Sequence, residues 1–188
     1  VAFFGFAIVV YGLSVKLIGK QSPLKFLKAI LPAALNAFGT CSSSATIPLS
    51  KQCMEEEMGV SNQITSIAIP LGATVNMDGT SIMQGVAVIF VAQIFGITLS
   101  PSDLVTVIIT ATLASIGTSG VPSVGLITLA MVFQSVGVPT EGIALIMGID
   151  RILDMTRTAV NITGDAVCTT IVAHQNKALD KKVFYETE

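Results

Sequence analysis

Five polar residues recur at helical spacing inside one apolar stretch near the C-terminal end of the chain. Residues 143–173 are mostly apolar, yet this stretch contains Asp150, Asp154, Arg157, Asn161 and Asp165, separated by steps of four, three, four and four residues. At about 3.6 residues per turn, these steps place all five on one face of a helix. A charged face on an otherwise apolar helix must lie against a cavity or a protein partner, because neither lipid nor a dry core solvates it. This face is therefore the predicted binding site.

The chemistry of this face points to a zwitterionic ligand. Asp154 can pair with an ammonium group, and Arg157, about one turn further on, can hold a carboxylate through two parallel hydrogen bonds. The two together favour a zwitterion that carries an additional acid. The alternative is that Asp154 and Arg157 form a structural i,i+3 ion pair, and that Asp78 and Asp165 are hydrogen-bonded core carboxylates.

The composition indicates a polytopic membrane protein. The chain has 188 residues, of which 52% are hydrophobic and 12% charged, against roughly 25% charged in soluble domains. The net charge of −2 and the lack of a basic run give no indication of nucleic-acid binding. Three widely spaced cysteines and a single histidine argue against a zinc site.

The elements that must position the charged face are predicted from the remaining polar interruptions. We expect an all-α integral membrane protein with transmembrane helices and two re-entrant helical hairpins. The predicted segments are a transmembrane helix at 1–19, hairpin one at 22–59, a broken transmembrane helix at 61–97, hairpin two at 102–137, a transmembrane helix at 139–174 and a cytoplasmic tail at 175–188.

Prolines, serines and glycines predict where these segments turn. In hairpin one, a helix over Pro23–Gly39, capped by Ser22 and interrupted at Pro32, leads to a hydroxyl-rich tip at Ser42–Ser44, and a helix resumes at Ile47. The long apolar run 61–97 breaks at Asn76–Thr80. Hairpin two has its tip at residues 115–123, with Pro122 at the start of its second helix.

The distribution of basic residues predicts the orientation. Lysines follow the first and the last apolar segments, and residues 52–150 contain no Lys or Arg, so the positive-inside rule places both ends in the cytoplasm. Each half then has a hairpin followed by a segment with polar interruptions, and the two hairpins enter from opposite sides. Two interrupted segments at corresponding places are the sequence indication of a transporter site at mid-membrane.

The polar interruptions supply ligands for small cations as well as for an anion. Backbone carbonyls that leave their helical hydrogen bonds, and carboxylates, are hard oxygen ligands for cations. The N–H groups at the start of a half-helix can bind a substrate carboxylate. An enzymatic function is less well supported, because the chain has neither the Lys-Ser/Thr of a P-loop nor the Gly-x-Ser-x-Gly motif of a hydrolase nucleophile. An intramembrane hydrolase using two aspartates would leave both hairpin tips unexplained, and an ion channel is a further alternative.

Four motifs resemble the dicarboxylate/amino acid:cation symporter family, which includes archaeal aspartate and mammalian glutamate transporters. They are SSSATIP, NMDGT, ASIGTSGVPSVG and D-x-x-x-D-x-x-R-T-x-x-N-x-x-G-D over Asp150–Asp165, and the resemblance runs from Val1 to Ala173. It implies most of the transport domain of an elevator-type secondary transporter. The scaffold and trimerisation helices, and the third helix, are absent from this stretch, and the full-length protein is expected to be a homotrimer.

The resemblance also implies roles for individual residues. Substrate would contact Ser43, Ser44, Thr80, Val121, Gly125, Asp154, Arg157, Thr158 and Asn161. One sodium site would use Gly72, Asn76, Asn161 and Asp165. A second would use Thr74, Ser115, Ile116 and Thr118 near Met77, and a third Asn76 and Asp78.

The implied function is sodium-coupled uptake of aspartate or glutamate across the cell membrane, with no enzymatic activity and no cofactor other than the coupling ions. Cys41 and Met155 stand where archaeal and mammalian relatives, respectively, carry an arginine, and Gln84 stands where mammalian glutamate transporters have Glu. The chain therefore looks prokaryotic, from an inner membrane, and without mammalian-type proton and potassium coupling. Proton coupling, or transport of a C4-dicarboxylate or a neutral amino acid, stays open as an alternative within the family.

Overall fold

The computed structural model describes residues 1–116, 122–180 and 182–183, and the regular elements of this part of the chain are all helical. Its elements are α1 (Ala2–Phe6), the π-turn η1 (Ala7–Tyr11), α2 (Gly12–Leu17), α3 (Pro23–Thr40), α4 (Ser43–Gln52), the π-turn η2 (Cys53–Glu57), α5 (Asn62–Val75), α6 (Asp78–Ile94), α7 (Pro101–Ile116), α8 (Val124–Ser135), the 3₁₀ turn η3 (Thr140–Gly142), α9 (Ile143–Met147) and α10 (Asp150–Gln175). The all-α prediction is confirmed for the described residues.

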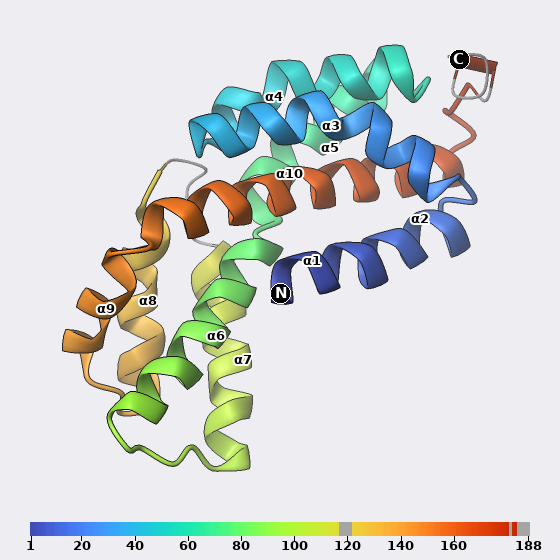
Figure 1. Cartoon of the computed structure of the whole chain (residues 1–188). Coiled ribbons are helices and arrows are strands. Elements are labelled where there is room, and N and C mark those ends of the chain that lie inside the picture. The colour runs from blue at the N-terminus through green and yellow to red at the C-terminus, as the bar shows by residue number, and fades with distance from the viewer. Residues whose placement is uncertain (117–121, 181, 184–188) are drawn as a thin grey trace.

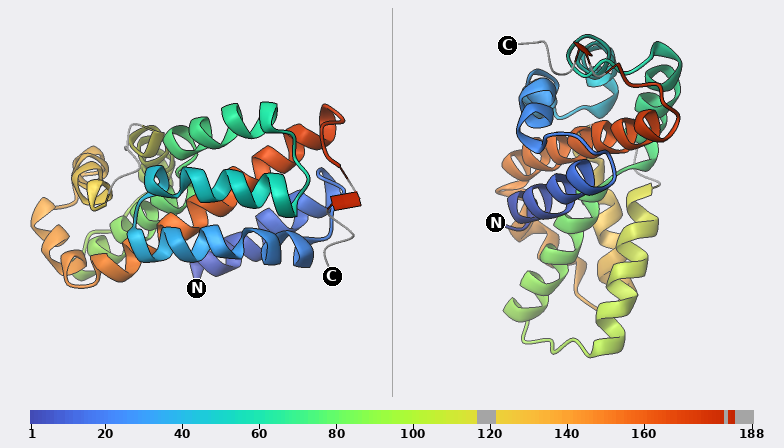
Figure 2. Two further views of the ribbon diagram at one scale, coloured as in Figure 1. Left: turned by 90° about the horizontal axis from the view of Figure 1, so that it is seen from above. Right: turned by 90° about the vertical axis from the view of Figure 1, so that its right-hand side faces the viewer.

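Helix α10 is the central element. It crosses the middle of the molecule, with α3, α4 and α5 along one side and the α1–α2 segment along the other (Figure 1). The group α6, α7 and α8 extends away from the N-terminal end of α10, and α9 links α8 to α10 (Figures 1 and 2). Fifteen residues of α10 are buried, so this helix is enclosed by protein along most of its length.

Two apolar clusters hold these groups together. The first joins η1, α3, α5 and α10, with Phe26, Ile30, Met54 and Ile162 among its fully buried side chains. The second joins α6, α7, α8 and α9 around Val88, Val91, Leu129 and Phe133. The polar face of α10 therefore lies where two separately packed groups of helices meet.

The first helix of the α3–α4 hairpin, α3, is continuous over its whole length. The predicted interruption at Pro32 is wrong, because α3 continues through this exposed proline while its neighbours Ala29, Ile30 and Ala33 are buried. Loss of one N–H at an exposed position is offset by this packing.

The second helix of the hairpin also begins earlier than expected, at Ser43 and not at Ile47. Cys41 takes a left-handed conformation, with φ 53°, and the Ser42 hydroxyl accepts a hydrogen bond from the Ala45 N–H at 3.2 Å. The hydroxyl-rich run is thus a helix cap followed by a first turn.

The other predicted turns are narrower or shifted, and residues 117–121 of the predicted tip of hairpin two lie outside the described residues. The break between α5 and α6 consists of Asn76 and Met77 alone, and Asp78 already begins α6. Pro122 does not start a helix, because Ser123 has φ 63° and α8 begins only at Val124. The predicted helix 139–174 is divided at Gly148 and Ile149, so that all five polar residues of the charged face lie on α10.

The chain after α10 returns to the loop that precedes α5. Leu179 forms an isolated antiparallel bridge with Val60, and the Asp180 N–H donates to the Gly59 carbonyl at 2.7 Å. Gly59 has φ 67°, and a Cβ there would overlap the Asp180 carbonyl oxygen, so this contact requires glycine. The end of α10 is thereby attached to the end of the α3–α4 hairpin.

Hydropathy alone is weak evidence for a membrane location. Among the described residues, one helical stretch, Asn62–Ile94 across the α5–α6 break, is long and apolar enough to cross a bilayer. A core helix of a soluble protein can pass the same test, so the membrane assignment depends on the site and on the family.

Candidate functional site

A buried ion pair on α10 joins Asp154 and Arg157. Arg157 Nη2 lies 2.9 Å from Asp154 Oδ1, and Nε donates to the same oxygen at 3.0 Å. Asp154 is 1% exposed and Arg157 3% exposed. The structural pairing that the sequence left open is therefore present, and each charge is compensated by the other in a water-poor environment.

Glycines of two neighbouring helices let this pair come close to the backbone. At Gly125 of α8, a Cβ would overlap the Arg157 guanidinium, whose Cζ would lie 2.6 Å away. At Gly79 of α6, a Cβ would lie 2.5 Å from the Arg157 carbonyl oxygen. The guanidinium thus lies against α8 while the backbone of α10 lies against the start of α6, and a side chain at either glycine would displace them.

The carboxylate of Asp154 also contacts the region before α8. Its Oδ2 accepts the Ser123 N–H at 2.9 Å, and the Thr158 hydroxyl donates to the Asp154 carbonyl at 2.7 Å. Helix α4, which begins just after the turn of the α3–α4 hairpin, packs against α10. The segments before α4 and before α8 therefore both lead into helices or loops that contact α10.

A second cluster of oxygens lies further along α10. The Asn76 side-chain amide donates to the Asn161 carbonyl at 3.1 Å and to Asp165 Oδ1 at 2.9 Å. The Asn161 side chain accepts the Gly79 N–H at 2.8 Å and donates to Met77 Sδ at 3.2 Å. The α5–α6 break is therefore anchored to α10 through hydrogen bonds on both sides of Met77.

Asp165 provides the test of whether this cluster suits a cation. It is 1% exposed, and its Oδ2 is buried with no hydrogen-bond partner among the described residues. Gly72 packs directly on this carboxylate, since a Cβ there would lie 2.6 Å from Oδ1. A buried carboxylate oxygen without a hydrogen-bond partner is a hard oxygen donor of the kind that sodium takes, so Asp165 fits a small cation.

Tyr11 is a member of the site that the sequence analysis missed. Its hydroxyl donates to Asp78 Oδ2 at 2.8 Å and lies 3.3 Å from the Val160 carbonyl oxygen. The only signal in the sequence was a tyrosine in a segment that otherwise contains little but apolar residues. Spacing could not reveal the contact, because 67 residues separate Tyr11 from Asp78.

The remaining predicted site residues differ in their exposure. Ser43, Thr80, Met77 and Ser115 are buried, and Ser81 donates to the Ser115 hydroxyl at 2.7 Å. Ser44, Thr74 and Ile116 are exposed in this structure. Thr118 and Val121 lie outside the described residues.

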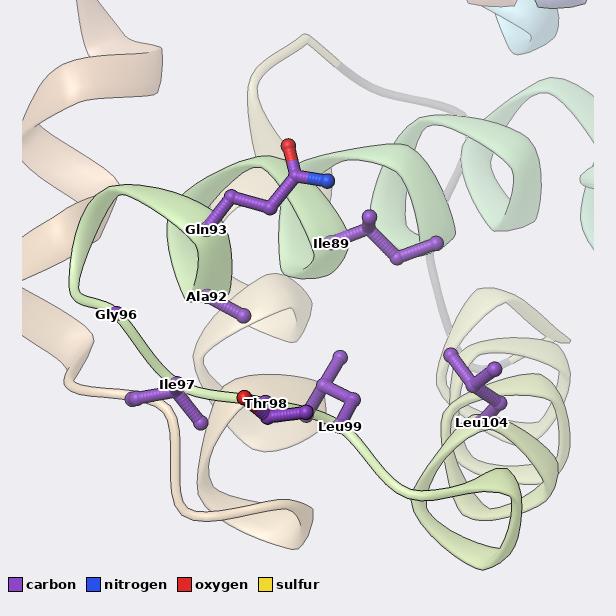
Figure 3. Close-up of a pocket in the computed structure, with 8 residues that line it drawn as sticks. All are labelled: Ile89, Ala92, Gln93, Gly96, Ile97, Thr98, Leu99 and Leu104. Atoms are coloured by element: carbon purple, nitrogen blue, oxygen red, sulfur yellow. The ribbon is translucent and has the colours of Figure 1, made fainter.

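Two cavities lie apart from the ion pair. A cavity of about 490 Å³ is lined by residues of the end of α6, the following loop and the start of α7, with Ile89, Thr98 and Leu104 among them (Figure 3). A second, of about 290 Å³, is lined by apolar residues including Phe3, Phe90 and Met83. Met83 also accepts from Arg157 Nη1 at 3.7 Å, so one methionine separates this apolar space from the charged pair.

The fold and the site together define a helical protein that holds buried charged and polar side chains inside an apolar body. Residues 1–175 match the family described as the sodium:dicarboxylate symporter family, and the chain belongs to it. The predicted family is thereby confirmed, and transport and membrane association are properties of this family.

Similar proteins include transporters of two kinds. An excitatory amino acid transporter of Caenorhabditis elegans is 47% identical over 85% of this chain and 32% of its own length. Human excitatory amino acid transporter 2 is 43% identical over 85% of the chain and 28% of its own length. Human neutral amino acid transporter A is 42% identical over 87% and 31%. The chain therefore spans about a third of the length of these relatives.

Replacing Gly79 by alanine tests the close contact between α6 and α10. We expect the added methyl to separate the helices and to lower the free energy of unfolding by roughly 1–3 kcal/mol, as overpacking does. Gly85, in the same helix, has nothing within 4 Å of its ideal Cβ. The matched Gly85→Ala variant should therefore be neutral or slightly stabilising. Thermal unfolding in detergent measures both, and equal effects of the two variants would contradict this account.

Proposed function

We propose that this chain forms part of a secondary symporter that couples inward sodium movement to uptake of an acidic amino acid, aspartate or glutamate. The proposal rests on the observation that one buried helix face holds an ion pair, Asp154 and Arg157, whose groups match an amine and a carboxylate, and a carboxylate with an unpartnered oxygen, Asp165. Membership of the sodium:dicarboxylate symporter family supports this proposal.

In this proposal, substrate binding replaces the ion pair between Asp154 and Arg157, because each residue then pairs with the opposite charge of the substrate. The ammonium group binds Asp154 and the side-chain carboxylate binds the Arg157 guanidinium, which is planar and has parallel N–H donors. Thr158 and Asn161 take the main carboxylate, with Ser43, Ser44, Thr80, Val121 and Gly125 completing the pocket. A ligand with a complementary acid and base keeps both protein charges compensated, which a substrate with one charge cannot do.

Sodium would be the coupling ion, and no other cofactor is proposed. Gly72, Asn76, Asn161 and Asp165 form the first site, and Thr74, Met77, Ser115, Ile116 and Thr118 the second. The third is formed by Asn76 and Asp78. Binding of sodium to Asp165 would compensate a buried charge and order the α5–α6 break, which also borders the substrate residues. Coupling then follows because both ligands stabilise one arrangement of α6 and α10.

The wider architecture is proposed in the same terms. The segments are a transmembrane helix at 1–19, re-entrant hairpins at 22–59 and 102–137, a broken transmembrane helix at 61–97, a last transmembrane helix through 174 and a cytoplasmic tail. They form the moving part of an elevator-type transporter in a lipid bilayer, homotrimeric as a full-length protein. We place it in a prokaryotic inner membrane and propose no enzymatic activity or nucleic-acid partner.

Transport of a neutral amino acid is the second candidate. Its support is the 42% identity to a protein named neutral amino acid transporter A. Against it stands Arg157, whose buried guanidinium has Asp154 and Met83 as its side-chain partners among the described residues, so that a neutral substrate would bring it no further acid. Proton coupling or a C4-dicarboxylate substrate would keep the same site, and an ion channel would conduct without substrate.

Uptake by the full-length protein in liposomes tests the proposal directly. We expect radiolabelled aspartate to accumulate only with an inward sodium gradient, and excess aspartate to block it while serine and succinate do not. Serine competition would favour the neutral candidate, because serine lacks the second acid. Uptake driven by a proton gradient alone would overturn the assignment of the coupling ion.

Substitution of Arg157 tests the binding of the acidic group. Arg157→Ala should weaken aspartate binding about 100-fold or more, because two charge-assisted hydrogen bonds are lost at about 1.5–3 kcal/mol each. Arg151, two turns earlier on α10 and exposed, provides the matched control, and Arg151→Ala should leave the affinity within about threefold. Aspartate competition curves in uptake assays measure both. Unchanged aspartate affinity in Arg157→Ala would show that this arginine does not hold the substrate.

Substitution of Asp165 tests the first cation site. Asp165→Asn keeps the shape of the side chain and removes its charge, so the sodium concentration for half-maximal uptake should rise about tenfold or more. The matched control is Asp103→Asn in the first turn of α7, where the Asp103 carboxylate accepts hydrogen bonds from Ser100. Sodium titrations that overlay for wild type and Asp165→Asn would remove Asp165 from the cation site.

A further inference from the structure

A π-turn in the first helical segment isolates one polar side chain. Ile8 and Val9 of η1 are 69% and 56% exposed, whereas Tyr11, at the end of the same turn, is 4% exposed. A π-turn inserts an extra residue into a helix and shifts the direction of its side chains, and such turns are frequent at functional sites. Here it directs the single tyrosine of this segment inward, toward α6 and α10.

The Tyr11 hydroxyl lies between α6 and α10. It donates to Asp78 Oδ2 at 2.8 Å, and the Val160 carbonyl oxygen of α10 is 3.3 Å away. A phenol has one hydrogen to donate, and the charged carboxylate at the shorter distance is the stronger acceptor. The hydroxyl is therefore directed at Asp78, with the backbone of α10 beside it.

Helix α10 leaves space for this hydroxyl at Gly164. A Cβ at Gly164 would overlap the Tyr11 hydroxyl oxygen and lie 2.5 Å from Asn76 Nδ2. One glycine thus admits both the group that holds Asp78 and the amide that holds Asp165. The Tyr11 ring is fixed independently by an edge contact with Phe6, with ring centroids 5.0 Å apart.

We propose that Tyr11 is a positioning residue of the cation region, holding the Asp78 carboxylate so that Asp78 and Asn76 present their oxygens to a small dehydrated cation. This inference rests on the proposed sodium coupling. Asp78 begins α6 directly after the two-residue break, where no preceding helical turn restrains it. A hydrogen bond from a separate, well-packed segment supplies that restraint, as partners behind the ligands do in metal sites.

The test is sodium-dependent thermal stabilisation of the full-length protein in detergent without substrate, which does not depend on transport. Tyr11→Phe removes only the hydroxyl and keeps the ring contact with Phe6. We expect the sodium concentration for half-maximal stabilisation to rise about tenfold or more. Phe6→Leu, which removes the ring contact and keeps the hydroxyl, should shift the sodium titration less than Tyr11→Phe does.

A second variant disturbs the contact between Tyr11 and Asp78 from the side of α10. Gly164→Ala should displace the Tyr11 hydroxyl and shift the sodium titration in the same direction as Tyr11→Phe. A Tyr11→Phe titration that overlays wild type, while sodium still stabilises both proteins, would overturn this role and leave sodium coupling intact. Absence of sodium stabilisation in wild type would overturn sodium coupling itself, and this inference with it.

Discussion

The interior charges of α10 are the constraint on which the rest of this structure depends. An aspartate and an arginine that are 1% and 3% exposed cannot be solvated by water, so each must be compensated within the protein. They compensate one another in part, and Asp154 Oδ2 also accepts the Ser123 N–H from the segment before α8. A regular helix has few free backbone groups to offer along its length, which explains why α5 and α6 are separated, and why the α3–α4 turn lies near this face.

The same constraint explains the glycines around α10. Gly72, Gly79, Gly125 and Gly164 each lie where a Cβ would collide with a polar side chain or the backbone of another segment. Glycine inside a helix lowers its stability, yet at these positions it lets polar side chains and backbone of different segments come into direct contact. Gly85, by contrast, faces open space in the same helix as Gly79, so the close approach is a property of particular positions.

The sequence predicted the charged face and the α5–α6 break because both depend on local spacing and on residue types that do not fit lipid. It could not predict that α3 runs through Pro32, since the burial of Ala29, Ile30 and Ala33 that offsets the lost hydrogen bond is a tertiary property. The start of α4 at Ser43 was missed because serines suit both loops and helix caps. Tyr11 was missed for a different reason: its partner is 67 residues away, and the π-turn that directs it has no spacing pattern.

The bridge between Val60 and Leu179 has a practical consequence for anyone attaching a label to this protein. Residues 178–180 hydrogen-bond to residues 59–61, so a fluorescent domain or affinity tag joined close behind α10 would pull on the base of the α3–α4 hairpin. A linker that starts beyond residue 183 keeps this bridge intact.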